Sequence, residues 1–254
     1  MKVTFLGTGT SHGVPMIGCD CATCRSNDPR DHRLRPSIYV ECRDGTALLV
    51  DAGPDLRTQA LRHDIRRVDA VLFTHGHADH ILGIDELRRF NALQQRSVPC
   101  YADELTLRDI QQMFSYVFNP ATPKGGGVPD LGLIVVDGPF NVGAQQIVPV
   151  PLLHGTRSIL GFRLNEFAYL TDCSAIPSAS WPLLEGVEVL VIDALRDRPH
   201  PTHFTVDEAI AATERLAPRR AYLTHMCHDL PHAATCARLP QGVQLAYDGL
   251  VLEC

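Results

Sequence analysis

The sequence lacks any apolar run long enough to cross a membrane. Its 254 residues are 45% hydrophobic and 20% charged, with a mean hydropathy near zero (−0.02), which is typical of one large globular domain or two small ones. No apolar stretch approaches the roughly 18 residues that a transmembrane helix needs. The first strand-like run, Lys2 to Leu6, begins almost at Met1 and leaves no room for a signal peptide. We therefore expect a cytoplasmic protein with no membrane partner.

Lysine is scarce, and positive charge is not in excess. The net charge is −6 and the isoelectric point is about 6.0, which argues against a surface that binds nucleic acid as a whole. Of the 23 basic residues only Lys2 and Lys124 are lysines; the others are arginines. Arginine suits bidentate recognition of phosphate, although a GC-rich genome produces the same bias.

Two residue types that bind metals are abundant. The chain has nine cysteines and 12 histidines. Cysteines without an export signal favour metal or redox chemistry over a disulfide scaffold. Three of them lie close together as Cys19, Cys21 and Cys24. Composition alone therefore indicates metal sites.

Strand-like and helix-like stretches alternate along the whole chain. About a dozen strands are expected at 2–6, 37–42, 46–51, 70–74, 98–101, 133–136, 146–150, 159–164, 167–170, 188–192, 221–224 and 243–247. Helices are expected at 54–63, 85–93, 104–116 and 206–216, with Thr205 and Glu208 forming a capping box before the last. This pattern predicts an α/β (α+β) fold of two mixed sheets with outer helices. The segment Asn119–Pro129 is typical of a mobile loop or lid, and we expect a single domain over residues 1–254.

The strongest functional signal is the segment from Thr74 to His80, directly after the apolar run 69–73. An extended piece that enters a tight turn can direct His75 and His77 at one point, while Asp79 and His80 reach a second point nearby. Neutral imidazoles and carboxylates are natural ligands of zinc, manganese or iron. The segment therefore predicts a metal centre.

Three more residues of the same kind follow apolar strands. His154 follows 147–153, Asp172 follows 167–171 and His225 follows 221–224. Alone, each would more often be a strand-end surface residue. Together with the His75–His80 segment, they indicate further ligands of one metal centre.

The stretch from Gly13 to Cys24 suggests a second metal site. Cys-x-Cys-x-x-Cys offers three thiolates and lacks only a fourth ligand. His228 is the favoured fourth ligand and the adjacent Cys227 is its competitor. A closed site of this kind would hold a structural zinc ion and fix the N-terminal loop beside the rest of the chain.

The histidine and aspartate pattern resembles the metallo-β-lactamase superfamily. The resemblance implies an αββα sandwich with metals at one edge of two sheets. It implies one ion held by His75, His77 and His154, and another held by Asp79, His80 and His225, with Asp172 bridging both. Two ions roughly 3.5–4 Å apart would acidify a bridging water and make it the nucleophile. Asp51 and Asp193 are candidates to orient ligand imidazoles, or else ordinary strand-end turn residues.

The cysteine-containing segment also resembles a narrower family, the accessory phosphodiesterases of the carbon–phosphorus lyase system. That resemblance implies a dinuclear site, Mn²⁺ or Zn²⁺, a structural Zn²⁺ held by Cys19, Cys21, Cys24 and His228, and a homodimer. It implies catalytic roles for Asp79 and for His203, which would protonate the leaving oxygen. The implied substrate is a small cyclic phosphate or nucleotide-like diester such as 5-phosphoribosyl 1,2-cyclic phosphate.

Other functions fit the sequence less well. Endonucleolytic processing of tRNA 3′ ends would require a long tRNA-binding arm and a basic surface, and thioester hydrolysis would bring a further helical domain. Diiron relatives carry glutamate at the position of His77, and a scaffold that had lost catalysis would have lost ligands. Arg157 could pair with a substrate phosphate or be an exposed arginine in a turn; His200 is a neighbour of His203 of the same residue type.

Overall fold

The computed structural model describes residues 1–123 and 127–254, and within them the strands form two seven-stranded sheets. The first sheet has the order β14-β1-β2-β3-β4-β5-β6, with β14 Val251–Glu253, β1 Lys2–Gly7, β2 Ser37–Glu41, β3 Ala47–Val50, β4 Ala70–Leu72, β5 Val98–Ala102 and β6 Leu131–Val135. The second has the order β13-β12-β11-β10-β9-β8-β7, with β13 Val243–Leu245, β12 Arg220–Thr224, β11 Val189–Asp193, β10 Phe167–Leu170, β9 Arg157–Leu164, β8 Gln145–His154 and β7 Phe140–Val142. Both sheets mix parallel and antiparallel pairs.

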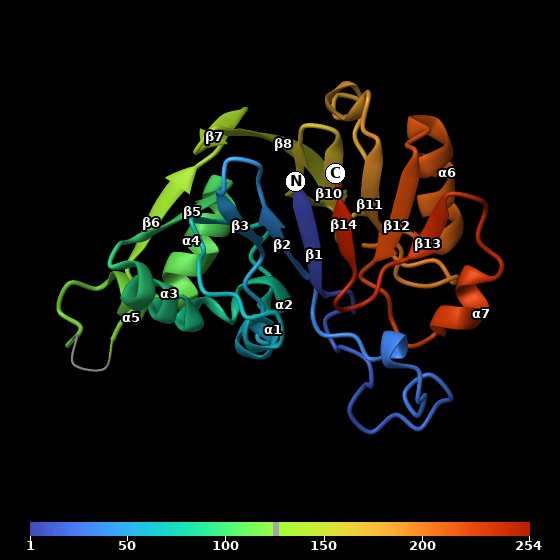
Figure 1. Ribbon diagram of the computed structural model, residues 1–254, viewed down its shortest axis with the longest axis horizontal. Coiled ribbons are helices and arrows are strands. Elements are labelled where there is room, and N and C mark those ends of the chain that lie inside the picture. Colours follow the sequence, from blue (N-terminus) through green and yellow to red (C-terminus); the bar gives the residue numbers. More distant parts are fainter. Residues whose placement is uncertain (124–126) are drawn as a thin grey trace.

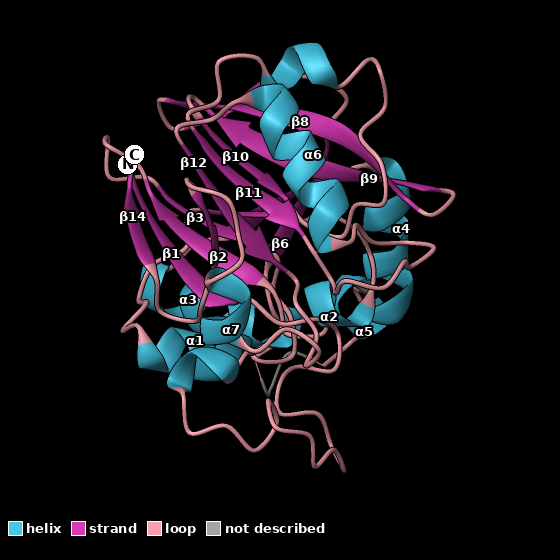
Figure 2. Cartoon of the chain, turned by 90° about the vertical axis from the view of Figure 1, so that its right-hand side faces the viewer, coloured by secondary structure: helices cyan, strands magenta, loops and turns pink. Residues whose placement is uncertain are grey.

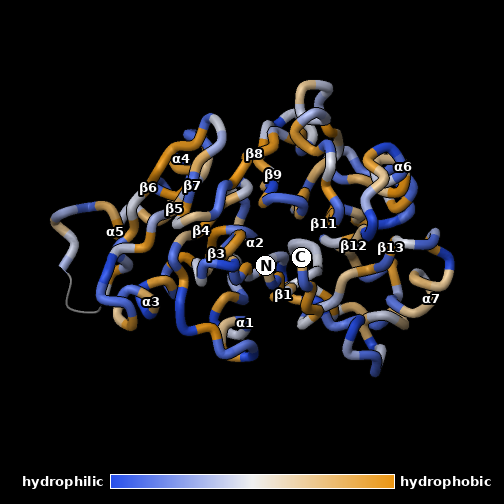
Figure 3. Tube along the Cα trace, turned by 45° about the horizontal axis from the view of Figure 1, so that its top comes forward, coloured by the Kyte–Doolittle hydropathy of each residue, from blue (hydrophilic) through white to orange (hydrophobic). Residues whose placement is uncertain are grey.

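Helices cover the outer faces of the two sheets, so the fold has the expected αββα layers (Figures 1 and 2). They are α1 Leu56–Arg62, α2 Ala78–Ile81, α3 Leu87–Gln94, α4 Glu104–Met113 and α5 Ser115–Phe118 beside the first sheet, and α6 Val206–Leu216 and α7 His232–Cys236 beside the second. Apolar residues lie along the strands of both sheets (Figure 3). One buried cluster fills the space between the sheets, and a second and a third lie under the outer helices.

The direction of the strands determines where chemistry can occur. In the second sheet β10, β11 and β12 run parallel, and in the first sheet β3, β4 and β5 do the same. The carboxyl ends of parallel strands meet at one edge of a sheet, where ligands bind in open α/β structures. A backbone hydrogen bond of 3.0 Å from Leu160 N to the carbonyl oxygen of Thr74 joins the two sheets beside that edge.

The fold class predicted from the sequence is confirmed, and the differences concern short elements. Strands β7 and β14 and helices α2 and α7 have three to five residues each, too few for a periodic pattern to form. The helix expected at 104–116 is two helices, because Phe114 leaves helical geometry at φ −109° and ψ 40°. The capping box of Thr205 and Glu208 is present as predicted.

Two further expectations concern the glycine-rich loop and the membrane. Residues 124–126, the glycine-rich part of the predicted mobile loop, lie outside the described residues. No helix in the described ranges combines the length and apolar character that crossing a membrane requires.

Candidate metal centre

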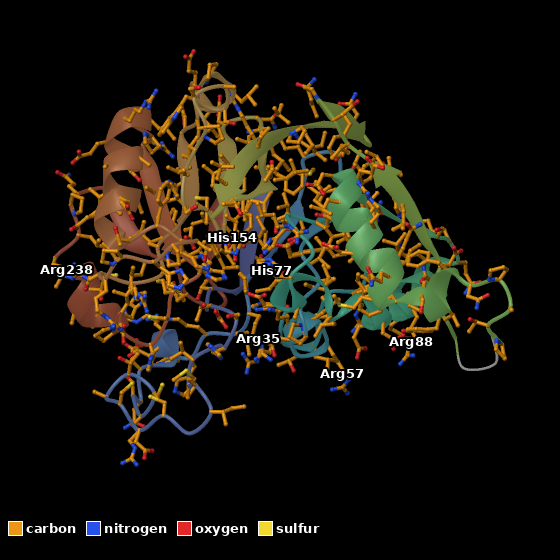
Figure 4. All side chains as sticks on the ribbon, turned by 180° about the vertical axis from the view of Figure 1, so that it is seen from behind. Arg35, Arg57, His77, Arg88, His154 and Arg238 are labelled. Atoms are coloured by element: carbon orange, nitrogen blue, oxygen red, sulfur yellow. The ribbon has the colours of Figure 1, made fainter. Side chains whose placement is uncertain are left out.

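Three imidazoles meet at the edge where the sheets face each other. His75 and His77 follow β4, and His154 is the last residue of β8. Their ligand nitrogens lie within 4.8 Å of one another, and Figure 4 shows His77 and His154 next to each other in the middle of the molecule. His154 Nδ1 lies 2.8 Å from the carbonyl oxygen of Thr202. Because a carbonyl only accepts, Nδ1 carries the proton and Nε2 is free to coordinate.

A second group of ligands adjoins the first. It consists of Asp79, His80, Asp172 and His225, all buried and all within 4.8 Å of one another. The Asp172 carboxylate lies between the two groups. Its Oδ1 is 3.1 Å from His225 Nε2 and 3.9 Å from His75 Nε2, and its Oδ2 is 3.2 Å from His80 Nε2. The geometry of Asp172 therefore suits a bridging ligand.

The backbone turns sharply at the strand ends that present these side chains. Asp172 follows β10 with φ 57°, His225 follows β12 with φ 61°, and Asp51 follows β3 with φ 62°. Residues other than glycine seldom adopt this left-handed conformation, although aspartate tolerates it better than most. Strained residues of this kind concentrate at functional sites. Sequence patterns give no signal of this strain.

Asp51 holds His80 in one orientation. Its Oδ2 accepts a hydrogen bond from His80 Nδ1 at 2.7 Å and another from Thr74 Oγ1 at 2.9 Å, while Oδ1 accepts from Thr74 N at 2.8 Å. The carboxylate is fully buried. His80 therefore keeps its proton on Nδ1 and directs Nε2 toward Asp79 and Asp172, which is the role that sequence analysis suggested for Asp51.

Asp193 plays a similar part at the end of β11. Its Oδ2 accepts from the backbone N–H of Phe204 at 2.9 Å and lies 3.3 Å from His203 Nδ1, and its Oδ1 lies 3.6 Å from His225 Nδ1. The ring of His203 stacks on His225 with centroids 4.7 Å apart. The structure thus brings His203 to the edge of the two ligand groups, and it places His200 next to it at a centroid distance of 5.1 Å.

The electrostatics of the centre favour cations. Burial opposes the charged form of His80, but Asp172, Asp79 and Asp51 outweigh it and hold the pKa of His80 well above its usual value. The same competition, with Asp172 as the main carboxylate, raises the pKa of His225 to about 10. His75, buried with no such excess of carboxylate, has its pKa well below the usual value. The carboxylates therefore attract positive charge into a buried site.

These residues fit a pair of divalent ions. The Nε2 atoms of His75, His80 and His225 are buried and have no hydrogen-bond partner among the residues that the structure describes, which is costly unless something binds them. All three face carboxylate oxygens across distances of 3.1–3.9 Å. Imidazole nitrogen with carboxylate oxygen is the donor set of Zn²⁺, Mn²⁺ and Fe²⁺ sites.

The three clustered cysteines converge on one histidine. His228 Nδ1 lies 3.1 Å from Cys19 Sγ, 3.3 Å from Cys21 Sγ and 3.6 Å from Cys24 Sγ. Cys227 points elsewhere, and its sulfur accepts from the backbone N–H of Asp229. A hydrogen bond from the backbone N–H of Cys24 lowers the pKa of the Cys21 thiol to about 6, which favours the thiolate that metals bind. His228 is therefore the fourth member of a Cys3His donor set that suits zinc.

Arg157 is not an exposed turn residue, because it begins β9 and forms an ion pair. Its Nη2 lies 2.5 Å from Oδ2 of Asp109 on α4. Asp109 in turn packs on the ligand loop: a methyl group on Gly76 would lie 2.7 Å from Asp109 Cβ. Sequence analysis missed Asp109, since one aspartate in a helix carries no signal of its own.

One cavity lies away from this metal centre. Its volume is about 940 Å³, it lies between α1 and α3, and none of the ligand residues lines it. Arg57 and Arg88 line it, and in Figure 4 both lie below and to the right of His77 and His154.

The chain is similar to a known family and to several solved structures. Residues 46–226 match the family described as the Beta-lactamase superfamily domain. A crystal structure of a diphosphatase from the PhnP family is 46% identical, with a TM-score of 0.92, over 100% of this chain and 97% of that chain. The Zn²⁺-bound PqqB of Methylobacterium extorquens shares the fold at 20% identity and a TM-score of 0.78, over all of both chains.

A longer relative also matches. A protein of Porphyromonas gingivalis named octanoyltransferase is 36% identical over 252 residues, which is 98% of this chain. The chain spans about half (51%) of the length of that relative.

Proposed function

The chain belongs to the β-lactamase superfamily and, within it, to the PhnP family, and on this premise we propose that it is a phosphodiesterase that hydrolyses a small phosphodiester. It is a metal-dependent hydrolase by family. The proposal adds the reaction class: a cyclic phosphate or nucleotide-like diester is the substrate, and 5-phosphoribosyl 1,2-cyclic phosphate is one candidate.

The observation that carries the proposal is the double ligand set around Asp172. His75, His77 and His154 form one group, and Asp79, His80 and His225 form the other. A site with two divalent ions, Mn²⁺ or Zn²⁺, would neutralise the oxygens of a transferring phosphoryl group and lower the pKa of a water molecule. A phosphodiester carries a negative charge that a thioester or lactam lacks, and a pair of cations would neutralise it.

The residues around the ligands have separate tasks. Asp51 and the carbonyl of Thr202 fix the tautomers of His80 and His154, so that both present Nε2 to the site. Asp193 lies against Nδ1 of His203, which leaves Nε2 of His203 to give a proton to the leaving oxygen. Asp79 acts as a ligand whose carboxylate also faces substrate. The Cys3His set would hold a structural Zn²⁺ and tie the N-terminal loop to the segment that follows His225.

Two other readings have less support. The short human tRNase Z shares the fold at 22% identity, but the net charge of −6 opposes an RNA substrate. The octanoyltransferase name belongs to a relative about twice the length of the matched region. The ligand groups of this chain suit divalent ions, which activate water, and this favours hydrolysis over acyl transfer.

The test is turnover by the reconstituted protein. Apo-protein loaded separately with Mn²⁺ and Zn²⁺ is assayed with bis(4-nitrophenyl) phosphate, with 4-nitrophenyl phosphate and with a thioester. We expect turnover of the diester only, lost in His75→Ala and kept in His63→Ala, a histidine on the far end of α1 that belongs to neither ligand group.

Other outcomes would reject parts of the proposal. Thioester cleavage without diester turnover would overturn the reaction class and leave the metal centre standing. Diester turnover that survives in His75→Ala would mean that the activity does not come from this centre. The predicted homodimer is tested separately by light scattering during gel filtration.

A further inference from the structure

Arg157 lies directly opposite a metal ligand in the second sheet. In the register of β8 and β9 it pairs with His154, across the two-residue turn at 155–156. Residues that face each other in an antiparallel pair have their side chains on the same side of the sheet, with Cβ atoms about 4.5–5.5 Å apart. The side chain of Arg157 therefore leaves its strand on the side where His154 meets the other ligands of its group.

Asp109 holds the end of that side chain beside the ligand loop. Arg157 Nη2 lies 2.5 Å from Asp109 Oδ2. The same carboxylate lies against Gly76, the residue between the ligands His75 and His77, because a Cβ atom on Gly76 would overlap it. The guanidinium is thus fixed next to the loop that carries His77.

The metal centre is open on this side. In the group of His75, His77 and His154, only His77 is exposed. The side chain of Arg157 is itself 25% exposed. A substrate can reach this group of ligands where the protein leaves it uncovered, so Arg157 borders a route of approach to the centre.

The ion pair leaves most of the guanidinium available. Within the described residues only its Nη2 has a hydrogen-bond partner, and its Nε is buried and unpartnered there. A guanidinium has five N–H donors in a fixed fork, so one contact with Asp109 orients the fork without filling it. A buried donor without a partner is costly unless something binds it. Arginine in this state suits an incoming phosphate group, which accepts several charge-assisted hydrogen bonds.

We propose that Arg157 binds an oxygen of the phosphate group that is cleaved, and that Asp109 is the residue that positions its guanidinium. The phosphate concerned is the one at the metal centre, because the guanidinium is held next to the ligand loop. The inference rests on the proposed phosphodiesterase function and adds a substrate-binding residue to it.

Binding of inorganic phosphate to the Mn²⁺-loaded protein, measured by titration calorimetry, tests this assignment without requiring turnover. Wild type is compared with Arg157→Gln and with Arg108→Gln. Arg108 also lies on α4 but pairs with Glu104 on its exposed face, so this variant removes the same charge away from the ligand loop. We expect Arg157→Gln to weaken phosphate binding about tenfold, as for the loss of one charged hydrogen bond, and Arg108→Gln to bind like the wild type. The affinity for Mn²⁺, measured by chelator competition, should be unchanged in both variants.

Variants of Asp109 test the positioning role. Asp109→Ala should weaken phosphate binding, and the double variant Arg157→Gln/Asp109→Ala should bind no more weakly than Arg157→Gln alone, because losses that act through one contact are not additive. Asp109→Asn should bind phosphate more tightly than Asp109→Ala, since its amide oxygen can still accept from Nη2 of Arg157. A merely structural effect of Asp109 would instead add to the loss in the double variant.

Each other result contradicts a defined part of the inference. Phosphate binding by Arg157→Gln that equals the wild type, or an equal loss in Arg108→Gln, would reject the assignment of Arg157. A parallel loss of Mn²⁺ affinity in Arg157→Gln would also reject it, because Arg157 would then act on the ligand loop. Additive losses in the double variant would reject the role of Asp109.

The cleavage of bis(4-nitrophenyl) phosphate separates this inference from the function on which it rests. We expect kcat/KM for this diester to fall in Arg157→Gln in parallel with phosphate affinity. If the wild type cleaves no diester, the phosphodiesterase proposal fails, and Arg157-dependent binding of inorganic phosphate would still support the binding role. If the wild type cleaves the diester but binds phosphate independently of Arg157, only the present inference is rejected.

Discussion

Replacing Asp51 by Asn is the sharpest test of how the metal centre is organised. The change keeps the shape of the side chain and removes one acceptor. Asn also tolerates the left-handed backbone at this position, so the substitution adds little strain. The Asn oxygen can keep the hydrogen bond from Thr74 N, which leaves its NH₂ group facing His80 Nδ1, where the carboxylate accepts at 2.7 Å in the native protein.

An NH₂ group cannot accept the proton of His80. The imidazole must therefore present a lone pair at Nδ1 and carry its proton on Nε2, the atom that lies 3.2 Å from Asp172 and 3.3 Å from Asp79. A protonated Nε2 cannot coordinate a metal ion. Loss of a residue that orients a ligand typically costs about 10–100-fold in metal affinity, which is about 1.4–2.8 kcal/mol. We expect a loss at the upper end of this range, because the wrong tautomer blocks coordination.

The assay is competition with a fluorescent chelator, with Mn²⁺ and Zn²⁺ titrated separately. Asp248→Asn is the control, because that carboxylate also accepts from a backbone N–H and a threonine hydroxyl, those of Leu34 and Thr8, but not from an imidazole. One ion should bind as in the wild type and the other more weakly in Asp51→Asn alone. Unchanged affinity for both ions in Asp51→Asn would refute the tautomer argument.

Three further predictions concern stability and the cysteine site. Arg33 is buried and pairs with the buried carboxylate of Asp31. Arg33→Met removes the cation from this pair, so it should lower the free energy of unfolding, measured in urea, by about 3 kcal/mol. A loss below about 1 kcal/mol would contradict this. Burial lowers the pKa of His232 from 6.5 to about 4, so its contribution is complete above pH 6.5 and is lost as the pH falls toward 4. His232→Gln should therefore reduce the acid-induced loss of stability between those values by at most about 3 kcal/mol, and parallel stability curves for the two proteins would show that His232 does not contribute. His228→Ala should lower the zinc content by one ion per chain and Cys227→Ser should not, as measured by mass spectrometry of the metals; the reverse result would exchange their roles.

The ligand types and their positions after strands could be read from the sequence because chemistry and strand pattern coincide there. His154, Asp172 and His225 each end an apolar run, and parallel strands bring such ends to one edge. Two mixed sheets with outer helices follow from the same alternation of strands and helices, whereas the αββα order of the layers was implied by resemblance. The bridging position of Asp172 was implied by resemblance, and the distances to His75, His80 and His225 suit it.

The residues that sequence analysis missed act through contacts between distant segments. Asp109 lies on a helix yet packs against the ligand loop and pairs with Arg157. Arg33 is a buried arginine in a loop, where it donates to the carbonyl of Cys227. No local pattern distinguishes either residue from an exposed charge. The choice between His228 and Cys227 also required coordinates, because both residue types bind zinc and the two positions are adjacent.

The native arrangement of the centre is costly to the fold in two independent ways. Asp51, Asp172 and His225 have left-handed backbone conformations, each of which costs of order 1–3 kcal/mol for a residue other than glycine. Asp51, Asp172 and Asp193 are carboxylates with almost no exposure to solvent, and buried carboxylates are unfavourable unless positive charge compensates them. Both costs fall at the one edge where the unpartnered Nε2 atoms of His75, His80 and His225 also lie. A ligand that binds only the folded chain stabilises it in proportion to its occupancy. Bound cations would offset both costs, and for this reason the fold and the metal centre are expected to be coupled thermodynamically.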